Sequence, residues 1–207
     1  MNIVVDLDGT IVDTNRVLEK KVRKVYPHFS MRRVLTYDYN KSLTSPPPWL
    51  VASSIDTGNY YLNAPRDYVL TMYDPCLYHN IRFFKGVVQC LRELASHENV
   101  IFYTLVQCAA EAESKKRLLA KVFKGQRYNF VWRLASEGKP PLPFADIVFD
   151  DCYTNLAVYP KSCKRVLIHR QYNHQLVSKA SSEGILVVRN LADFPFRALG
   201  GVRSGNL

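Results

Sequence analysis

The stretch Ile3-Val4-Val5-Asp6-Leu7-Asp8-Gly9-Thr10 decides how the rest of the chain is interpreted. Its apolar and mostly β-branched beginning predicts a short buried strand. Side chains alternate along a strand, so Asp6 and Asp8 are expected on the same side of the backbone. Two carboxylates this close together are costly unless a cation or a reaction requires them. Gly9 permits a tight turn and Thr10 adds a hydroxyl group, so the stretch predicts the centre of an enzyme site.

The composition predicts one domain, or one domain with a modest insertion. The 207 residues are 47% hydrophobic with a mean hydropathy of -0.15, which is sufficient for a packed core. No apolar run approaches the roughly 20 residues of a membrane span, and aspartates stand where a signal peptide would be apolar. The five cysteines show no CxxC spacing, which argues against a disulfide framework or a zinc site. We therefore expect a soluble, cytoplasmic protein without a membrane partner.

The chain is strongly basic, with a net charge of +10 and a pI of about 9.4. A basic protein attracts anions, so nucleotides, other phosphate esters and nucleic acid are all candidate partners. Charge alone does not choose among them, and the oligomeric state is open.

Short apolar strands alternate with helical stretches along most of the chain. Amphipathic patterns predict helices over residues 15–25, 87–96, 109–123 and 191–199. Apolar runs predict strands over 99–104, 129–134, 146–149, 165–169 and 185–188. This order is typical of βαβ units, so we expect an α/β fold with a mostly parallel sheet.

Residues 15–82 are interpreted as an insertion that folds over the site. Pro46-Pro47-Pro48 breaks any regular element there, and a helix is expected near residues 65–73. The aromatic residues of this segment either contact the substrate or form the insertion's own small core. The candidate substrate contacts are Trp49, Tyr60 and Tyr61.

Polar side chains close three of the predicted strands. Thr104 ends the second, and Asp150-Asp151 follow the strand at 146–149. Parallel sheets bind ligands at the carboxyl ends of their strands, where these groups and the first two aspartates would meet. Such carboxylates can hold Mg²⁺, attack phosphorus and transfer protons, while a hydroxyl and a lysine bind phosphate oxygens. The set predicts phosphoryl transfer.

In order, spacing and strand context these motifs resemble those of the haloacid dehalogenase (HAD) superfamily over roughly residues 1–170. Asp6-Leu7-Asp8-Gly9-Thr10 is similar to its first motif, Thr104 to the second and Asp150-Asp151 to the fourth. The resemblance implies a Rossmann-like HAD core formed by residues 1–14 and 83–207. It also implies that residues 15–82 are a small, mainly helical cap of the C1 type.

The resemblance also implies roles. Asp6 would be the nucleophile and a Mg²⁺ ligand, and Asp8 the general acid and base that offers its backbone carbonyl to the metal. Thr104 would bind phosphate and Asp150 would be the third Mg²⁺ ligand. Asp151, Gly9 and Thr10 would support them. An aspartate at position 8 is a feature of the superfamily's phosphatases and phosphotransferases.

The third motif is a phosphate-binding lysine, for which we choose Lys139. It lies in the loop before the acidic strand. Lys115, Lys116 and Lys124 are alternatives, and each is expected to be a surface lysine of the helix over 109–123 or its end.

Within the superfamily, the C-terminal third looks most like the 5'(3')-deoxyribonucleotidase group. The similarity covers Lys139, the strand before Asp150-Asp151, and the later strand that leads into Gln171-Tyr172-Asn173. It implies a Mg²⁺-dependent phosphatase for a nucleoside 5'- or 3'-monophosphate. Two alternatives are a phosphatase acting on nucleic-acid ends, and a HAD-like binding or structural module with little catalysis.

Overall fold

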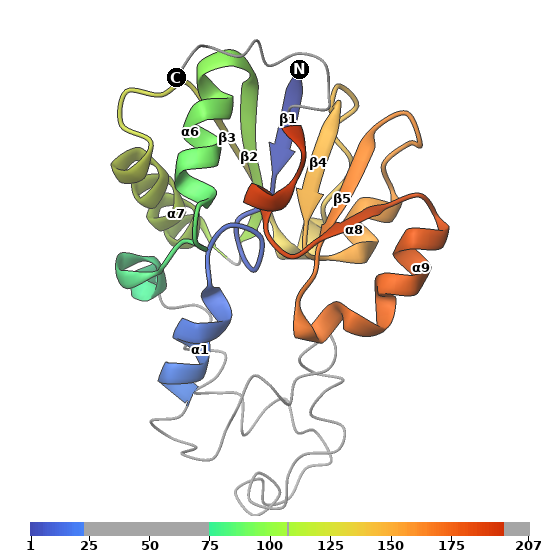
Figure 1. Ribbon diagram of the computed structural model, residues 1–207. Coiled ribbons are helices and arrows are strands. Elements are labelled where there is room, and N and C mark those ends of the chain that lie inside the picture. The colour runs from blue at the N-terminus through green and yellow to red at the C-terminus, as the bar shows by residue number, and fades with distance from the viewer. Residues whose placement is uncertain (23–74, 107, 197–207) are drawn as a thin grey trace, which may run out of the picture.

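The computed structural model describes residues 1–22, 75–106 and 108–196 (Figure 1). Its centre is a six-stranded sheet in the order β3-β2-β1-β4-β5-β6, and every neighbouring pair is parallel. The strands are β1 (Asn2–Val5), β2 (Asn99–Val106), β3 (Asn129–Leu134), β4 (Ile147–Asp150), β5 (Lys164–Ile168) and β6 (Leu186–Val188). The predicted α/β fold with a mostly parallel, Rossmann-like sheet is thus confirmed.

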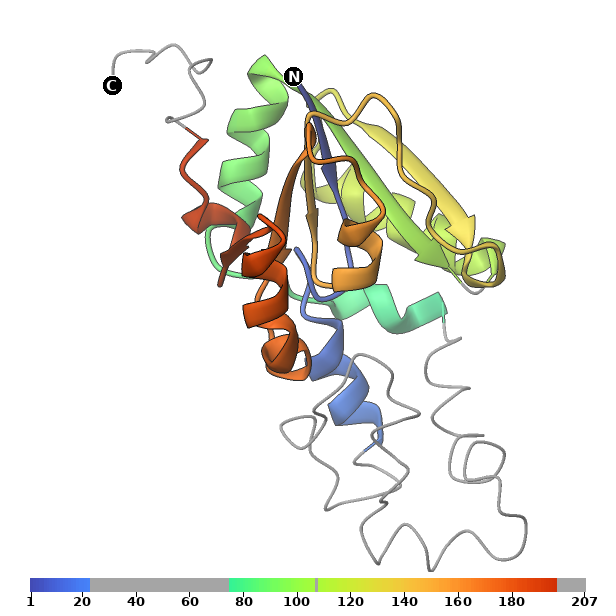
Figure 2. The same ribbon diagram turned by 90° about the vertical axis from the view of Figure 1, so that its right-hand side faces the viewer.

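Helices cover both faces of the sheet. The α-helices are α1 (Thr14–Val22), α6 (Val87–His97), α7 (Ala109–Val122), α8 (Tyr153–Ala157) and α9 (Val177–Ser182). Short 3₁₀ helices are η2 (Pro75–Asn80), η3 (Ala135–Glu137), η4 (Gln171–Leu176) and η5 (Leu191–Asp193). In the turned view of Figure 2, α6 and α8 lie on opposite sides of the sheet. Among the described residues, no helix has the length and apolar character needed to cross a bilayer.

The two faces follow from the alternation of side chains along the strands. Ile3 and Val5 of β1 pack in the cluster that contains the buried residues of α6 and α7, whereas Val4 packs with those of α8 and α9. All three side chains are at most 1% exposed. A strand buried on both faces reads as an unbroken apolar run, and this is why β1 was predictable.

The sheet changes its direction of growth next to β1. From β1 the chain proceeds to β2 and β3 on one side, whereas β4, β5 and β6 extend the sheet on the other. Connections leaving the carboxyl ends of β1 and β4 therefore run to opposite faces of the sheet, and parallel sheets bind ligands at such a point. Asp6 follows β1 and Asp150 ends β4, so both lie at this edge.

The C-terminal end of the described chain differs from its prediction. The predicted helix over residues 191–199 is wrong for its described part, which contains only η5. Asn190 accepts a hydrogen bond from the Ala192 backbone at 3.2 Å, and Pro195 has no N–H to continue a helix. Three other predictions lie outside the described residues. They are the end of this helix at 197–199, the helix over 65–73, and the candidate substrate contacts Trp49, Tyr60 and Tyr61. The boundaries of the 15–82 insertion stay a prediction.

Candidate active site

The turn after β1 wraps around the carbonyl oxygen of Leu7. Backbone N–H groups of Ile11 and Val12 donate to it at 2.9 and 3.1 Å. Gly9 adopts a φ of 69°, which favours glycine. A Cβ at this position would also overlap the carboxyl group of Asp151 and the hydroxyl of Tyr172. Gly9 therefore supports the site through both its backbone conformation and its small size.

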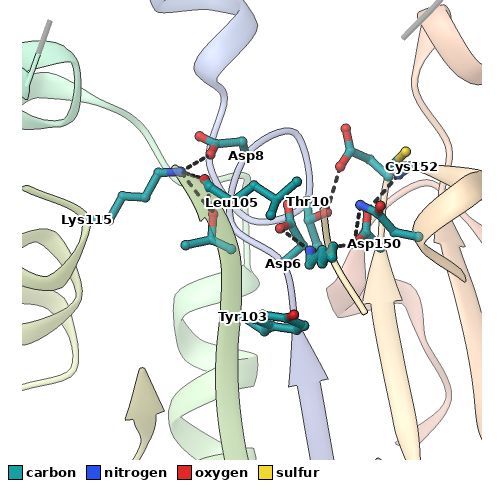
Figure 3. A network of polar contacts seen from close by, with 12 residues as sticks. Asp6, Asp8, Thr10, Tyr103, Leu105, Lys115, Asp150 and Cys152 are labelled. Carbon is teal, nitrogen blue, oxygen red and sulfur yellow. Dashed lines mark hydrogen bonds and ion pairs between the residues drawn. The ribbon is translucent and has the colours of Figure 1, made fainter. Parts of the chain in front are cut away.

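Asp6 and Asp150 are joined by Lys139. The Lys139 ammonium group lies 2.5 Å from Asp6 Oδ1 and 2.7 Å from Asp150 Oδ2, and its side chain is 4% exposed. The Asp6 N–H donates to Phe149 O at 2.9 Å, which extends the pairing of β1 with β4 to the aspartate itself. The structure thus brings the chosen lysine to the two carboxylates that the sequence indicated. Figure 3 shows Asp6 and Asp150 side by side, with the Tyr103 ring beneath.

The two aspartates at the end of β4 have different partners. Asp150 Oδ1 accepts from the Cys152 N–H at 2.8 Å, and the Asn155 amide donates to the same carboxylate. Asp151 Oδ1 accepts from the Thr10 hydroxyl at 3.2 Å, and Asp151 Oδ2 accepts from Tyr172. Asp151 therefore holds the turn after β1, whereas Asp150 faces Lys139.

Burial of these carboxylates changes their protonation. Loss of water around Asp6 raises its pKa to about 7; Lys139 opposes this rise, whereas Asp150 and Asp8 add to it. Burial likewise raises the pKa of Asp151 well above its usual range, with further contributions from Asp150 and Asp6. Burial would lower the pKa of Lys139, but the two facing carboxylates outweigh it and raise that pKa. Lys139 is therefore charged near neutral pH.

The chemistry of this group fits a divalent cation. Oxygens of Asp6, Asp150 and Asp151 lie within 4.8 Å of one another. Among the described residues, Lys139 forms ion pairs with Asp6 and Asp150, whereas Asp151 accepts hydrogen bonds from the Thr10 and Tyr172 hydroxyls. Mg²⁺ takes oxygen ligands at about 2.1 Å and would supply the missing positive charge. The residues present therefore suit the metal that the motifs imply.

A second lysine lies on the other side of the turn (Figure 3). Lys115 is fully buried, and its ammonium group lies 2.6 Å from Asp8 Oδ2 and 2.9 Å from Thr104 Oγ1. The expectation of a surface lysine at this position is wrong, because this part of α7 faces the carboxyl end of β2. Lys116 and Lys124 are exposed, as predicted.

Sequence reasoning missed several residues around the site. Glu111 lies 2.9 Å from the Lys115 ammonium group, and the Tyr78 hydroxyl donates to Asp8 Oδ1 at 2.8 Å. Arg170 Nε donates to Gly9 O at 2.6 Å. The Glu111–Lys115 spacing within a predicted helix was an available signal. Neither Tyr78 nor Arg170 has a local signal, because each reaches the site from a distant segment.

The sequence matches the family model of haloacid dehalogenase-like hydrolases over residues 3–115. Comparison with curated proteins gives no match. Among solved structures, a haloacid dehalogenase-like family hydrolase from Streptococcus pneumoniae has a TM-score of 0.55 at 14% identity, covering 96% of each chain. A provisionally named phosphoglycolate phosphatase from Lactobacillus plantarum has a TM-score of 0.51 at 14% identity, covering 91% of this chain and 94% of that one.

These structural likenesses concern the fold, since the identities are low. The matched segment contains β1, the turn with its two aspartates, β2 and the first half of α7. It covers more than half of the 207 residues. The chain therefore belongs to the haloacid dehalogenase-like hydrolases.

Proposed function

We propose that the protein is a Mg²⁺-dependent phosphatase that hydrolyses a phosphate monoester through an aspartyl-phosphate on Asp6. The observation that carries this proposal is the contact of Lys139 with both Asp6 and Asp150, next to the turn that contains Asp8. A nucleophilic carboxylate, a second carboxylate for proton transfer and a fixed cation are the groups that phosphoryl transfer needs.

Two carboxylates divide the reaction between them. An oxygen of ionised Asp6 attacks phosphorus, and the bond from phosphorus to the leaving oxygen breaks with its electron pair going to that oxygen. Asp8 donates its carboxyl proton to the same oxygen. In the second step Asp8 takes a proton from a water molecule that attacks phosphorus, which releases phosphate and regenerates Asp6.

The remaining residues hold charge and geometry. Lys139 neutralises Asp6 and Asp150 and offers hydrogens to phosphate oxygens, and Thr104 is assigned to phosphate binding. Asp6, Asp150 and the backbone carbonyl of Asp8 would hold Mg²⁺, with Asp151 in support. When bound, Mg²⁺ offsets the negative charge of the phosphate group.

The proposed substrate is a small phosphate ester, in the first place a nucleoside 5'- or 3'-monophosphate. The nucleotidase-like pattern around Lys139, Asp150-Asp151 and Gln171-Tyr172-Asn173 supports this choice. Residues 15–82 are proposed as a C1-type cap that selects the substrate. The L. plantarum protein that shares the fold is named for a small phosphate ester as well.

The test is phosphate release from a panel of nucleotides, sugar phosphates and an aryl phosphate, with and without Mg²⁺. We expect the wild type to hydrolyse at least one nucleoside monophosphate. This turnover should require Mg²⁺ and should be lost in Asp6→Asn. If the wild type releases phosphate from none of these compounds, the proposal is wrong. Binding of nucleic acid or protein that Asp6→Asn leaves intact, without turnover, would favour a binding module.

The net charge of +10 favours one further candidate, a phosphatase acting on nucleic-acid ends. An end-phosphorylated oligonucleotide should then be hydrolysed faster than the mononucleotide. The rate of this hydrolysis should fall steeply with salt concentration. Basic residues that bind the phosphate backbone of a nucleic acid release its counterions, and added salt opposes that release. Equal or faster turnover of mononucleotides would exclude this candidate.

A further inference from the structure

Both carboxyl oxygens of Asp8 are held by side chains outside the motifs described above. Asp8 Oδ2 forms the ion pair with Lys115 at 2.6 Å, and Asp8 Oδ1 accepts from the Tyr78 hydroxyl at 2.8 Å. The Asp8 side chain is nevertheless 29% exposed. Its carboxyl group is therefore fixed in orientation and still accessible to a substrate.

Glu111 connects the two groups that hold Asp8. Glu111 Oε1 lies 2.9 Å from the Lys115 ammonium group and 3.1 Å from the Tyr78 hydroxyl. The ammonium group also lies above the Tyr78 ring, 5.2 Å from its centroid. Tyr78, Glu111 and Lys115 thus form one buried cluster, built from η2 and the first turns of α7, that ends on Asp8.

The cluster is separate from the group around Asp6. Lys139 contacts Asp6 and Asp150, whereas Lys115 contacts Asp8, Thr104 Oγ1 and the Leu105 carbonyl. Burial of a charged lysine destabilises a fold unless opposite charges face its ammonium group. Here the carboxylates of Asp8 and Glu111 face that of Lys115. Each of the two carboxylates with a proposed chemical step thus has its own buried lysine.

We propose that Tyr78, Glu111 and Lys115 are positioning residues for Asp8, and that protonation of the leaving oxygen depends on them. The inference rests on the proposed phosphatase function. When Asp8 gives its proton to the leaving oxygen, it becomes a carboxylate. Lys115 and Tyr78 donate hydrogen bonds to that carboxylate where it stands, so no rearrangement is needed during the step.

Two aryl phosphates separate positioning from general damage. The para-nitrophenolate ion is a stable leaving group that needs little protonation, whereas the leaving group of phenyl phosphate needs more. Tyr78→Phe removes the hydroxyl and keeps the ring. We expect it to lower kcat/KM for phenyl phosphate about tenfold or more, and that for para-nitrophenyl phosphate by less than about threefold.

The matched control is Tyr153→Phe. Tyr153 on α8 also donates from its hydroxyl to a glutamate, Glu183, at 2.7 Å, but it packs in the core on the other face of the sheet. Both rates should stay at the wild-type level in this variant. Lys115→Met should widen the difference between the two substrates further. Melting temperatures check its folding, and Tyr78→Phe keeps the test decisive if Lys115→Met does not fold.

Two outcomes overturn the inference, and they are distinguishable. If the wild type hydrolyses both compounds in an Asp6-dependent manner, but Tyr78→Phe lowers both rates equally or neither, the positioning role is wrong and the phosphatase function stands. If the wild type hydrolyses neither these two compounds nor any compound of the panel above, both the phosphatase function and the positioning role are wrong.

Discussion

The Lys139 ammonium group lies 2.5 Å from Asp6 Oδ1, although 133 positions separate the two residues along the chain. The contact exists because β1 and β4 are neighbours in the sheet, and Lys139, in the loop before β4, reaches the aspartates at the carboxyl ends of both strands. This single distance joins the first motif of the sequence to its C-terminal half. It also specifies the variant that examines the site most directly.

Lys139→Ala should reduce kcat by at least about a hundredfold. The variant removes the positive charge that faces Asp6 and Asp150, so Asp6 would hold its proton more tightly, and it removes a donor proposed to bind phosphate oxygens. Steady-state rates with saturating Mg²⁺ measure the loss. Lys116→Ala, which removes an exposed lysine of α7, is the control and should keep full activity. Near-normal turnover of Lys139→Ala would assign its role to another residue.

Gly9→Ala should destabilise the protein by about 1–3 kcal/mol and reduce activity. The added methyl group would overlap Asp151 and Tyr172, in a backbone conformation that alanine avoids. Gly125→Ala is a matched control, because Gly125 also has a positive φ, but beyond its chain neighbours no atom lies within 4 Å of where the methyl group would stand. Urea unfolding of both variants separates the overlap from the backbone strain. Equal losses would show that strain alone accounts for Gly9.

The metal-free protein should lose stability as pH rises from about 4 to about 7. The pKa of Asp6 is raised by burial to about 7, so the folded state binds this proton more tightly than the unfolded chain does. The stabilisation is therefore complete below the ordinary aspartate pKa of 3.8, decreases as pH rises above that value, and is lost by about pH 7. Melting temperatures of chelator-treated protein measure this fall.

Two comparisons check that pH dependence. Asp6→Asn should show a shallower fall, although not a flat line, because Asp151 has a raised pKa as well. Mg²⁺ should reduce the fall in the wild type, since a cation stabilises the ionised carboxylates. A steeper fall in Asp6→Asn than in the wild type would contradict the assignment to Asp6.

Asp150→Asn should weaken Mg²⁺ binding by about tenfold or more, because the amide removes a negative charge from the proposed ligand set. The dependence of the rate on Mg²⁺ concentration gives the apparent affinity. Asp146→Asn is the control. Asp146 accepts a hydrogen bond from the Asn2 backbone N–H at 2.7 Å, at the end of β1 and β4 opposite to Asp150. An unchanged Mg²⁺ requirement in Asp150→Asn would remove this residue from the ligand set.

The sheet was predictable because its strands are buried on both faces and appear as short apolar runs. The position of Lys139 could be predicted from its place in the loop before β4. The environment of Lys115 could not, because the pattern of α7 does not show that a polar position faces the end of β2. The hydrogen bond from Tyr78 to Asp8 could not be predicted either, because no local sequence pattern connects η2 to Asp8. The predicted last helix is replaced over residues 191–193 by the 3₁₀ turn η5, because Pro195 has no N–H to continue a helix.

The central place of β1 has a consequence for synthesis on the ribosome. Its first neighbour, β2, begins at Asn99, and its second, β4, begins at Ile147. The nascent chain must therefore carry the turn with Asp6 and Asp8 through most of translation before Lys139 and Asp150 emerge. Pairings of such long sequence separation form slowly. The proposed active site thus cannot assemble until these residues have been made, and a chain truncated before Lys139 would present Asp6 without the ammonium group that pairs with it.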